Sequence, residues 1–397
     1  MNPELEKQLE ALIGQINNKE DFDAVRDQLL KRGIESLLKA EMTAHLGYEK
    51  GNPATEGNQR NGFSEKTIKT QQGGQRIKIP RDRKATFDPV IVPKHQSISK
   101  ELEDCIQLLY AKGMSNSDII DFIENTYGVE YSTSQVSVIT NQLLEDIQEW
   151  QNRPLEDIYP IIWIDAIHYK IRQEGRVISK ACMIVLGVNV DGQQDILSMT
   201  IVESETASSW MAILDDLRSR GVRDIFFLCS DNLPGLDKAI EAIYPNSIRQ
   251  VCIVHQIRNS MKYVSYKDRK KVMSDIKGIY KADNEQLALE ALDSFKEKWD
   301  SKYHAAVQSW ERNWDNLAAF LNYPKEIRRL IYTTNIIESF NASLRKYTKN
   351  KKVFPNDNAA LKSIYLAAQS ISKKWKKTRF NWSQIYNQLY ICFPGRL

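Results

Sequence analysis

IIWIDAIHYKIR (161–172) opens the part of this 397-residue chain that decides its fold. It is followed by VISKACMIVLGVNV (177–190) and DILSMTIV (195–202), and all three runs have the apolar spacing of β-strands. Two short turns, Glu174-Gly175 and Asp191-Gly192, separate the runs and favour tight hairpins. The stretch therefore predicts three consecutive antiparallel strands.

Helices and strands alternate after the third run. An amphipathic helix ending at Gly221 leads to the apolar strand DIFFLCS (224–230), then to a helix over 236–243 and a strand over 247–254. Three meandering strands followed by helix, strand, helix and strand form the element order of the ribonuclease-H-like fold. From 256 to 334 the apolar spacing is helical, and a further helix begins near Asn335. We therefore expect an α/β fold in which a helical insertion interrupts a ribonuclease-H-like core.

The chain before this core divides into three regions. Residues 1–50 carry apolar residues at helical intervals and are expected to be helical. Residues 51–98 are rich in Gly, Pro, Asn and basic residues, with one short alternating run at 76–79, and are expected to form an extended basic connector lying along phosphates. Residues 99–150 contain two helix starts in quick succession, which is the outline of a helix-turn-helix DNA-binding domain.

The second helix of that pair is the candidate for reading DNA. Ser132-x-x-Gln135 marks its start as a capping box. Its apolar face comprises Val136, Ile139, Leu143 and Ile147. Gln135, Ser137 and Asn141 would then face outward near the helix start, where recognition helices meet base edges. Any pair of packed helices gives the same outline, so a purely structural role stays open.

Charge is strongly segregated along the chain. The net charge is only +4, from 55 Lys and Arg against 51 Asp and Glu, but residues 60–94 hold +6 and residues 345–379 hold +10. The rest of the chain is therefore acidic. Charge runs are often no more than solvated surface, yet two concentrated basic segments on an acidic chain favour a polyanionic partner such as nucleic acid.

Neither the cysteines nor the hydropathy favour an exported or membrane-bound protein. The five cysteines are scattered and never form a CxxC pair, so we expect reduced thiols rather than a disulfide framework or a cysteine-rich zinc module. No stretch approaches the ~18 uninterrupted apolar residues of a membrane span. The start, MNPELEKQLE, lacks the pattern of a secretory signal. The expected location is the cytoplasm, in association with DNA.

Two aspartates belong to strands that the expected sheet makes neighbours. Asp165 lies inside a run that is apolar on both faces, where a lone carboxylate is costly unless donors or a cation compensate it. Asp231 follows the apolar strand 224–230, at the carboxyl end where α/β proteins place active sites. A buried structural Asp and an ordinary helix N-cap are the alternatives. Two adjacent carboxylates repel each other unless a cation lies between them.

Glu338 lies at the head of the helix that begins near Asn335. Asn335-x-x-Glu338 also fits a capping box, in which the glutamate serves only its own helix end. Considered alone, that structural role is the stronger interpretation of Glu338.

Several long segments resemble the bacterial Mutator-type insertion-sequence transposases. The similarity extends from about residue 35 to the C-terminus. The segments are RNGFSEKTIKT (60–70), WIDAIHYK (163–170), GRVISKACMIVLGVNVDG (175–192), FLCSDNLPGLDKAIEAIYP (227–245), QVCIVHQIRNSMKYVSYKDRK (250–270), IRRLIYTTNIIESFNASLRK (327–346) and FPNDNAALK (354–362).

The resemblance implies a DDE transposase with a divided ribonuclease-H-like core. The acidic triad of the family falls on Asp165, Asp231 and Glu338, which would hold two Mg²⁺ or Mn²⁺ ions about 3.5–4 Å apart. The implied regions are 155–255 for the first part of the core, 256–334 for the helical insertion and 335–397 for the catalytic helix and the basic C-terminal region. The implied reaction cleaves the 3′ ends of the element and joins them to target DNA.

The resemblance also implies partners. These are double-stranded DNA, both terminal inverted repeats and target, and further copies of the chain in a homodimer or higher oligomer on DNA. Basic side chains after Glu338 would hold phosphates of the element ends. They are Arg345, Lys346, Lys349, Lys351 and Lys352.

The family also carries a Cys-x-x-His motif, matched by Cys252 and His255. One such pair is too few ligands for a structural zinc site, so a packed Cys and a hydrogen-bonding His near the active site are expected in preference to metal ligation. Asn232 replaces the glycine that the family commonly has after the second Asp. Asn tolerates left-handed backbone, so the turn can be retained.

Two other classes of function stay open on the sequence. A DNA-binding regulator would use the 99–150 helices without cleaving DNA. A nuclease on the same fold would cut without joining 3′ ends to a target. Detection of DNA cleavage that depends on a divalent metal would exclude the regulator, and detection of joined strands would exclude the nuclease.

Overall fold

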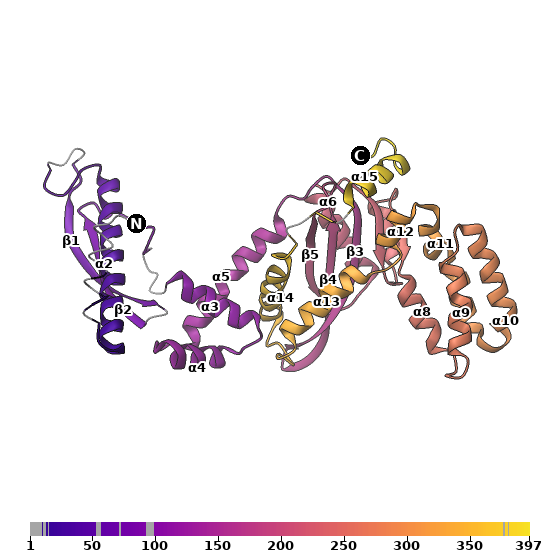
Figure 1. Cartoon of the computed structure of the whole chain (residues 1–397), viewed down its shortest axis with the longest axis horizontal. Coiled ribbons are helices and arrows are strands. Elements are labelled where there is room, and N and C mark those ends of the chain that lie inside the picture. Colours follow the sequence, from indigo (N-terminus) through magenta and orange to yellow (C-terminus); the bar gives the residue numbers. More distant parts are fainter. Residues whose placement is uncertain are drawn as a thin grey trace. The chain divides into compact units, whose positions relative to one another are not determined.

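From residue 158 onward, the helices and strands of the computed structural model follow the order expected from the sequence (Figure 1). The described residues are 10, 13–14, 16–52, 57–70, 73–92, 99–375, 378–379 and 381–397. The chain forms two compact units, Met1–Tyr110 with Met114–Thr140, and Ala111–Gly113 with Asn141–Leu397. Within the described ranges, no helix has the length and apolar character needed to cross a membrane.

A five-stranded mixed sheet forms the centre of the second unit. Its strands, in spatial order, are β5 (Gln194–Val202), β4 (Arg176–Val188), β3 (Ile158–Gln173), β6 (Asp224–Ser230) and β7 (Ile248–Val251). β3, β4 and β5 are antiparallel neighbours, whereas β6 and β7 run parallel to β3. This confirms the expected three-stranded meander and the central position of the strand that carries Asp165.

The turn between β3 and β4 has the backbone of a tight hairpin. Glu174 and Gly175 both have positive φ, 49° and 77°. Two successive residues with positive φ define the type I′ turn, whose twist matches that of the flanking strands. The turn therefore sets the register of β3 against β4, in which Asp165 lies opposite Ile184.

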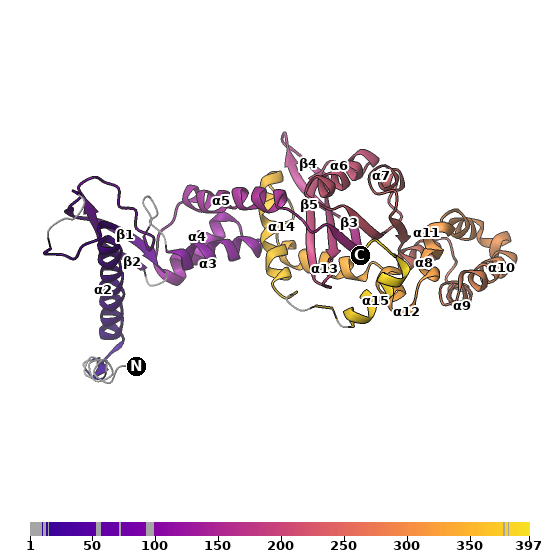
Figure 2. The same cartoon turned by 90° about the horizontal axis from the view of Figure 1, so that it is seen from above.

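Helices cover both faces of the sheet (Figure 2). One layer consists of α6 (Ala207–Ser219) and α7 (Leu236–Ile243), and the other includes α13 (Asn335–Thr348), α14 (Asp357–Ser372) and α15 (Trp382–Cys392). Because side chains alternate along a strand, Ile162 and Ile164 pack toward the first layer and Ile161 and Trp163 toward the second. Burial on both faces explains the nearly continuous apolar runs of these strands.

A group of helices separates β7 from α13, as the apolar spacing of 256–334 predicts. The helices are α8 (Ile253–Lys262), α9 (Arg269–Tyr280), α10 (Glu285–Arg312), α11 (Trp314–Ala318) and α12 (Lys325–Ile331). The apolar stripe of α10 packs into the same buried cluster as that of α9. Trp299 also donates a hydrogen bond to Asp275 at 2.7 Å, which fixes one helix against the other.

The C-terminal helix α15 is attached to the turn between β4 and β5. Trp382 donates its indole N–H to the carbonyl of Val190 at 2.8 Å, and the Arg379 amide donates to the carbonyl of Gly192 at 3.1 Å. Gly192 has φ of 76°, and a Cβ at this position would overlap the Trp382 ring. Glycine is therefore required here for both conformation and space.

In the first unit, helix α2 (Lys19–Leu46) packs on a β-hairpin of β1 (Arg60–Thr70) and β2 (Gly73–Asp82). Leu38, Ile68 and Ile77 form their shared buried core. The expectation of an extended basic connector over 51–98 is therefore wrong for most of its described residues. The basic side chains lie on paired strands rather than on an extended linker.

Three helices follow the hairpin, α3 (Lys100–Ala111), α4 (Asn116–Tyr127) and α5 (Thr133–Asn152). A capping box of Ser115 with Asp118 begins α4, and Gly128 in the left-handed conformation ends it. The expected apolar face of α5 is confirmed, because its four predicted members are all buried.

Candidate active site

Asp165 and Asp231 lie at adjacent positions of neighbouring parallel strands. The register of β3 against β6 pairs Ile164 with Ser230, and each aspartate is the next residue of its chain. β6 ends at Ser230, so Asp231 begins the loop at the carboxyl end of the strand. The expectation that the strands of Asp165 and Asp231 are neighbours is confirmed.

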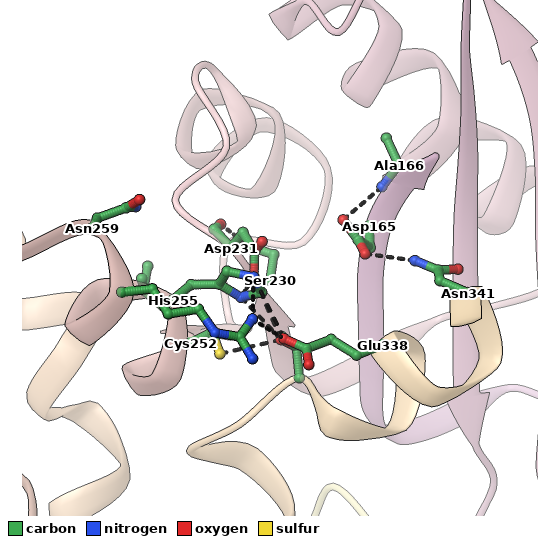
Figure 3. A network of polar contacts seen from close by, with 12 residues as sticks. Asp165, Ala166, Ser230, Asp231, Cys252, His255, Asn259, Glu338 and Asn341 are labelled. Atoms are coloured by element: carbon green, nitrogen blue, oxygen red, sulfur yellow. Dashed lines mark hydrogen bonds and ion pairs between the residues drawn. The ribbon is translucent and has the colours of Figure 1, made fainter. Parts of the chain in front are cut away.

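Asp165 is partly buried and held from two sides. The amide of Ala166 donates to Oδ1 at 2.8 Å, and Asn341 of α13 donates its side-chain amide to Oδ2 at 2.5 Å (Figure 3). Burial and the charge of Asp231 together raise the pKa of Asp165 to about 6. Burial is the larger cause of the raised pKa, and electrostatic repulsion between the Asp165 and Asp231 carboxylates adds to it.

Asp231 makes an ion pair rather than a helix cap. Its Oδ1 lies 2.5 Å from Nδ1 of His255, and Thr334 donates a weaker hydrogen bond to the same oxygen at 3.4 Å. The following helix, α7, has Gly235 at its N-cap and no side-chain capping bond. The structure therefore contradicts the N-cap alternative for Asp231.

Glu338 does not form the capping box that its spacing suggested. The N-cap of α13 is Thr334, and no described side chain caps this helix end. Oε1 of Glu338 instead accepts a hydrogen bond from Arg258 of α8 at 3.1 Å, and lies 3.4 Å from Nε2 of His255. Glu338 therefore points across to α8 rather than back to its own helix.

His255 links two of the three acidic residues. One ring nitrogen contacts Asp231 and the other contacts Glu338, and Figure 3 shows this cluster beside Asp165. The hydrogen bond to Asp231, followed by one to Cys252, raises the pKa of His255 to about 10. A protonated imidazole thus lies between two carboxylates, where it reduces their mutual repulsion.

Cys252 completes a second set of candidate ligands. Burial raises the pKa of its thiol, but hydrogen bonds with His255 and Thr334 outweigh burial and lower the pKa overall. The ligand atoms of Asp231, Cys252 and His255 lie within 4.8 Å of one another, and among the described residues they form the one such group of three. The carboxylates of Asp165, Asp231 and Glu338 do not form such a close group. A buried Cys252 and a hydrogen-bonding His255 agree with the sequence-based interpretation.

Three residues of this cluster were not identified from the sequence. They are Arg258, Thr334 and Asn341. Arg258 and Asn341 each lie three residues after a candidate residue on the same helix, a spacing that places both side chains on one face. Helical spacing could therefore have identified these two, whereas nothing in the sequence marks Thr334.

The turn after Asp231 does not use the left-handed conformation that we considered for Asn232. Asn232 is not among the non-glycine residues with positive φ. Its side-chain amide donates to Asn313 at the end of α10, at 3.2 Å. The Asn at this position therefore joins the loop after β6 to the end of α10.

The three predicted base-reading residues of α5 all have partners within the protein. The side chain of Gln135 accepts from the amide of Ser132 in the capping box, and Ser137 pairs with Asn116 of α4. Asn141 is exposed and accepts a hydrogen bond from Lys362 at 2.9 Å. Reading of bases by these side chains stays a prediction, and it requires that they exchange these partners for DNA.

The predicted phosphate-binding residues differ in exposure. Arg345, Lys346, Lys349 and Lys352 are exposed. Lys351 is half-buried over the ring of Phe354, and burial lowers its pKa to about 8. Four of the five residues are therefore exposed, as phosphate contact requires.

Comparison with known proteins agrees with the resemblance drawn from the sequence. The model of a family described as "Transposase, Mutator family" matches residues 2–378. A probable transposase for an ISRM3-like insertion sequence of Sinorhizobium fredii is 41% identical over 375 residues, covering 94% of each chain. The transposase for insertion sequence ISRM3 of Rhizobium meliloti is 40% identical over 377 residues, again covering 94% of each.

The chain is also similar to more distant transposases. The transposase of IS256 in transposon Tn4001 of Staphylococcus aureus is 29% identical over 357 residues, covering 89% of this chain and 91% of that one. The Drosophila P element transposase strand transfer complex overlaps 70% of this chain at 10% identity with a TM-score of 0.35, too low to assign a fold. The family match and the two relatives near 40% identity place the chain in the Mutator family of insertion-sequence transposases, enzymes that cleave and transfer DNA strands.

Proposed function

We propose that this transposase binds the ends of its insertion sequence, cleaves their 3′ ends and joins them to target DNA at a site built on Asp165, Asp231 and Glu338. One observation carries the proposal. Asp165 and Asp231 are adjacent on parallel strands, and Glu338 is linked to Asp231 through His255. The three residues come from three separate elements, and neither Asp231 nor Glu338 caps a helix.

We also propose that the sheet is the core of a ribonuclease-H-like domain. Numbered along the chain, its five strands have the spatial order 3-2-1-4-5, with an antiparallel first half and a parallel second half. Helices α8–α12 then form the insertion between the last strand and the helix of Glu338. The element order supports this assignment independently of any similarity in sequence.

The residues present fit divalent metal ions such as Mg²⁺ or Mn²⁺. Carboxylate oxygens are the ligands that these hard cations prefer. The raised pKa of Asp165, caused by burial and then by Asp231, indicates a site in which added positive charge is favourable. Two such ions held by Asp165, Asp231 and Glu338 would supply activation of the attacking oxygen and stabilisation of the leaving oxygen.

The neighbouring side chains position these carboxylates. Asn341 fixes the orientation of the Asp165 carboxylate, and His255 with Thr334 fixes Asp231. Arg258 holds Glu338 while keeping 56% of its own side chain exposed, so it can also face a phosphate of bound DNA. Positioning and charge stabilisation are the main contributions of a protein to phosphoryl transfer.

The partner that this chemistry requires is double-stranded DNA. We propose that the α4–α5 pair recognises the terminal inverted repeats, and that the exposed basic residues of α13 hold the backbone beside the active site. Two ends must be processed in one event, so we propose that at least two copies of the chain act together on DNA.

The test is a cleavage and joining reaction. The purified chain is incubated with labelled end fragments of its insertion sequence and a target plasmid, in Mg²⁺, in Mn²⁺ and in EDTA. We expect metal-dependent nicks at the 3′ ends, followed by products in which these ends are joined to the plasmid. Nicks without joined products would indicate a nuclease, and cleavage that persists in EDTA would contradict the metal-dependent site.

A further inference from the structure

A cavity of about 580 Å³ borders the flank of α13 that carries Asn335, Ser339 and Lys346. Successive residues of an α-helix advance by about 100°, so Asn335, Lys346 and Ser339 lie about 60°, 80° and 100° around the helix from Glu338, on the side opposite to Asn341. The same helix therefore contributes to both sites. The C-terminal end of α14, the segment before α15 and the start of β5 complete the lining.

The charge of this cavity is entirely positive. Lys346, Lys374 and Arg379 line it, and none of the described lining residues is Asp or Glu. None of the three forms an ion pair with another described residue. Nη1 of Arg379 is buried and has no hydrogen-bond partner among the described residues. A buried guanidinium nitrogen without an acceptor is costly, so this cavity favours an anionic ligand.

Aromatic rings form another part of the wall. Trp375 and Tyr347 line the cavity, and Trp375 is held by Phe340, whose ring centroid lies 5.5 Å away. Side-chain amides and hydroxyls of Gln194, Asn335, Ser339 and Ser343 also border the space. Flat rings suit stacking with a base, and these polar groups suit its edges.

We propose that this cavity binds one nucleotide of an unpaired DNA strand, with its phosphate against Lys346, Lys374 and Arg379 and its base against Trp375. Cationic grooves interleaved with aromatic rings are the usual means of binding single strands without sequence preference. The volume suits one nucleotide, since pockets of ~300–1,000 Å³ enclose ligands of that size. A base in an intact duplex is stacked and paired, so only an unpaired nucleotide can place its ring there.

The inference rests on the proposed function for its choice of ligand, because a nick next to α13 creates a strand end that can separate from its complement. A free deoxynucleotide has the same chemistry as one nucleotide of a strand. The two sources are therefore separated in the experiment.

The experiment uses the full chain in EDTA and a short oligothymidylate that carries one 2-aminopurine, whose fluorescence falls when it stacks on an aromatic ring. We expect quenching with the wild-type chain. Trp375→Ala should abolish the quenching and weaken binding about tenfold, whereas Trp375→Phe should retain part of it. Lys374→Glu should weaken binding about tenfold or more, while Lys373→Glu, which reverses an adjacent exposed charge outside the cavity, should have a much smaller effect.

Ser339→Met provides a variant that does not disturb the core, because Ser339 is exposed and a larger, non-aromatic side chain would occupy the cavity without quenching the probe itself. It should reduce quenching even if Trp375→Ala unfolds the chain. Equal effects of Lys374→Glu and Lys373→Glu, or quenching that survives Ser339→Met, would overturn the proposal. Free deoxyadenosine monophosphate provides a further test. If it displaces the oligonucleotide completely at a concentration equal to that of the oligonucleotide, the cavity is a site for free nucleotides and the proposal is overturned.

Parallel measurements keep this result distinct from the proposed function. Gel shifts with duplex ends report DNA binding, and the Mg²⁺ reaction reports cleavage. Cleavage by the wild-type chain without any quenching would overturn the nucleotide site alone. Loss of both activities would overturn the proposed function with it.

Discussion

Glu338 provides the sharpest test at the scale of one residue. It contacts Arg258 and His255 and caps no helix. Glu338→Gln keeps the size of the side chain and removes its charge. We expect nicking and strand joining to fall by orders of magnitude, while stability changes by less than about 1 kcal/mol, as for other partly exposed ion pairs.

The measurement is cleavage and joining of labelled ends in Mg²⁺, with a gel shift to check folding and DNA binding. Glu311→Gln is a matched control, because Glu311 also pairs with a basic residue, Lys296, but lies in α10 outside the cluster. Cleavage by the Glu338→Gln chain at the wild-type rate would remove this residue from the active site.

Asn341 gives a second prediction, concerning a residue that acts through Asp165. Its amide is the side-chain donor to the Asp165 carboxylate, and its own Oδ1 is buried without a hydrogen-bond partner among the described residues. Asn341→Ala should free the carboxylate to rotate. We expect about 10–100-fold weaker activity or metal affinity, as for other groups that orient a metal ligand.

The metal concentration for half-maximal cleavage should therefore rise, while the affinity for DNA ends stays unchanged. Thr348→Ala is the control, since it removes another buried polar group from the same helix, one that donates to the carbonyl of Leu344 rather than to a residue of the acidic cluster. Similar losses in both variants would mean that Asn341 stabilises α13 and has no positioning role.

The residue scale also shows where sequence reasoning reached its limit. The aspartates could be paired from strand order, because a parallel register aligns residues at the ends of neighbouring strands. The side-chain contacts of the cluster could not be predicted in this way. Asn341 and Asp165 are separated by 176 positions in the chain, and Arg258 and Glu338 by 80. A pattern such as Asn335-x-x-Glu338 reports only local options, and here the local option was not used.

At the scale of elements, the β1–β2 hairpin depends on one buried carboxylate. Asp82 ends β2 and is 4% exposed. It accepts hydrogen bonds from the side chains of Asn58 and Thr86 and from the amides of Thr86 and Phe87. Burial alone would raise the pKa of Asp82, but these hydrogen bonds outweigh it and hold the pKa well below the usual range.

This depressed pKa fixes the sign of a pH dependence. The charged form is favoured in the folded state, so the stabilisation is fully present above the unfolded pKa of about 3.9 and is lost as pH falls toward the lower folded value. Asp82→Asn should destabilise the first unit by about 2 kcal/mol at neutral pH, because the hydrogen bonds would no longer be made to a charged group.

Thermal unfolding of both chains at neutral pH and near pH 3 measures this effect. The difference between wild type and Asp82→Asn should shrink in acid. Asp88→Asn is the control, because Asp88 is an exposed carboxylate in the same segment. A difference that stays constant with pH would mean that the charge of Asp82 contributes nothing to stability.

The same hairpin explains why sequence reasoning missed an element. β1 and β2 bury only one face, so few apolar residues, such as Ile68 and Ile77, mark them among many charged ones. The strands of the central sheet are buried on both faces and carry long apolar runs that are easy to identify. One-sided burial therefore made a folded hairpin look like a basic linker.

At the scale of the whole molecule, the segregated charge predicts how DNA binding responds to salt. The segment 345–379 carries +10 in a chain whose net charge is only +4. Arg345, Lys346 and Lys349 are its exposed members on and directly after the helix of Glu338. If these residues contact phosphates, their neutralisation must reduce the number of counterions released on binding.

We therefore expect the triple change Arg345→Gln, Lys346→Gln and Lys349→Gln to weaken binding to all DNA sequences. It should also flatten the plot of log affinity against log salt by up to ~0.9 for each phosphate that the chain no longer neutralises. The measurement is the affinity for an end fragment and for unrelated duplex DNA over a range of salt concentrations.

A triple change in α10 supplies the matched control. Lys296, Lys298 and Lys302 pair with Glu311, Asp275 and Asp268, so changing them to Gln removes the same total charge from residues already neutralised locally. This control should leave the salt dependence close to that of the wild type. If the plot of log affinity against log salt flattens equally in both triple variants, DNA binding depends on the net charge of the chain. The basic residues of α13 would then not contact DNA phosphates.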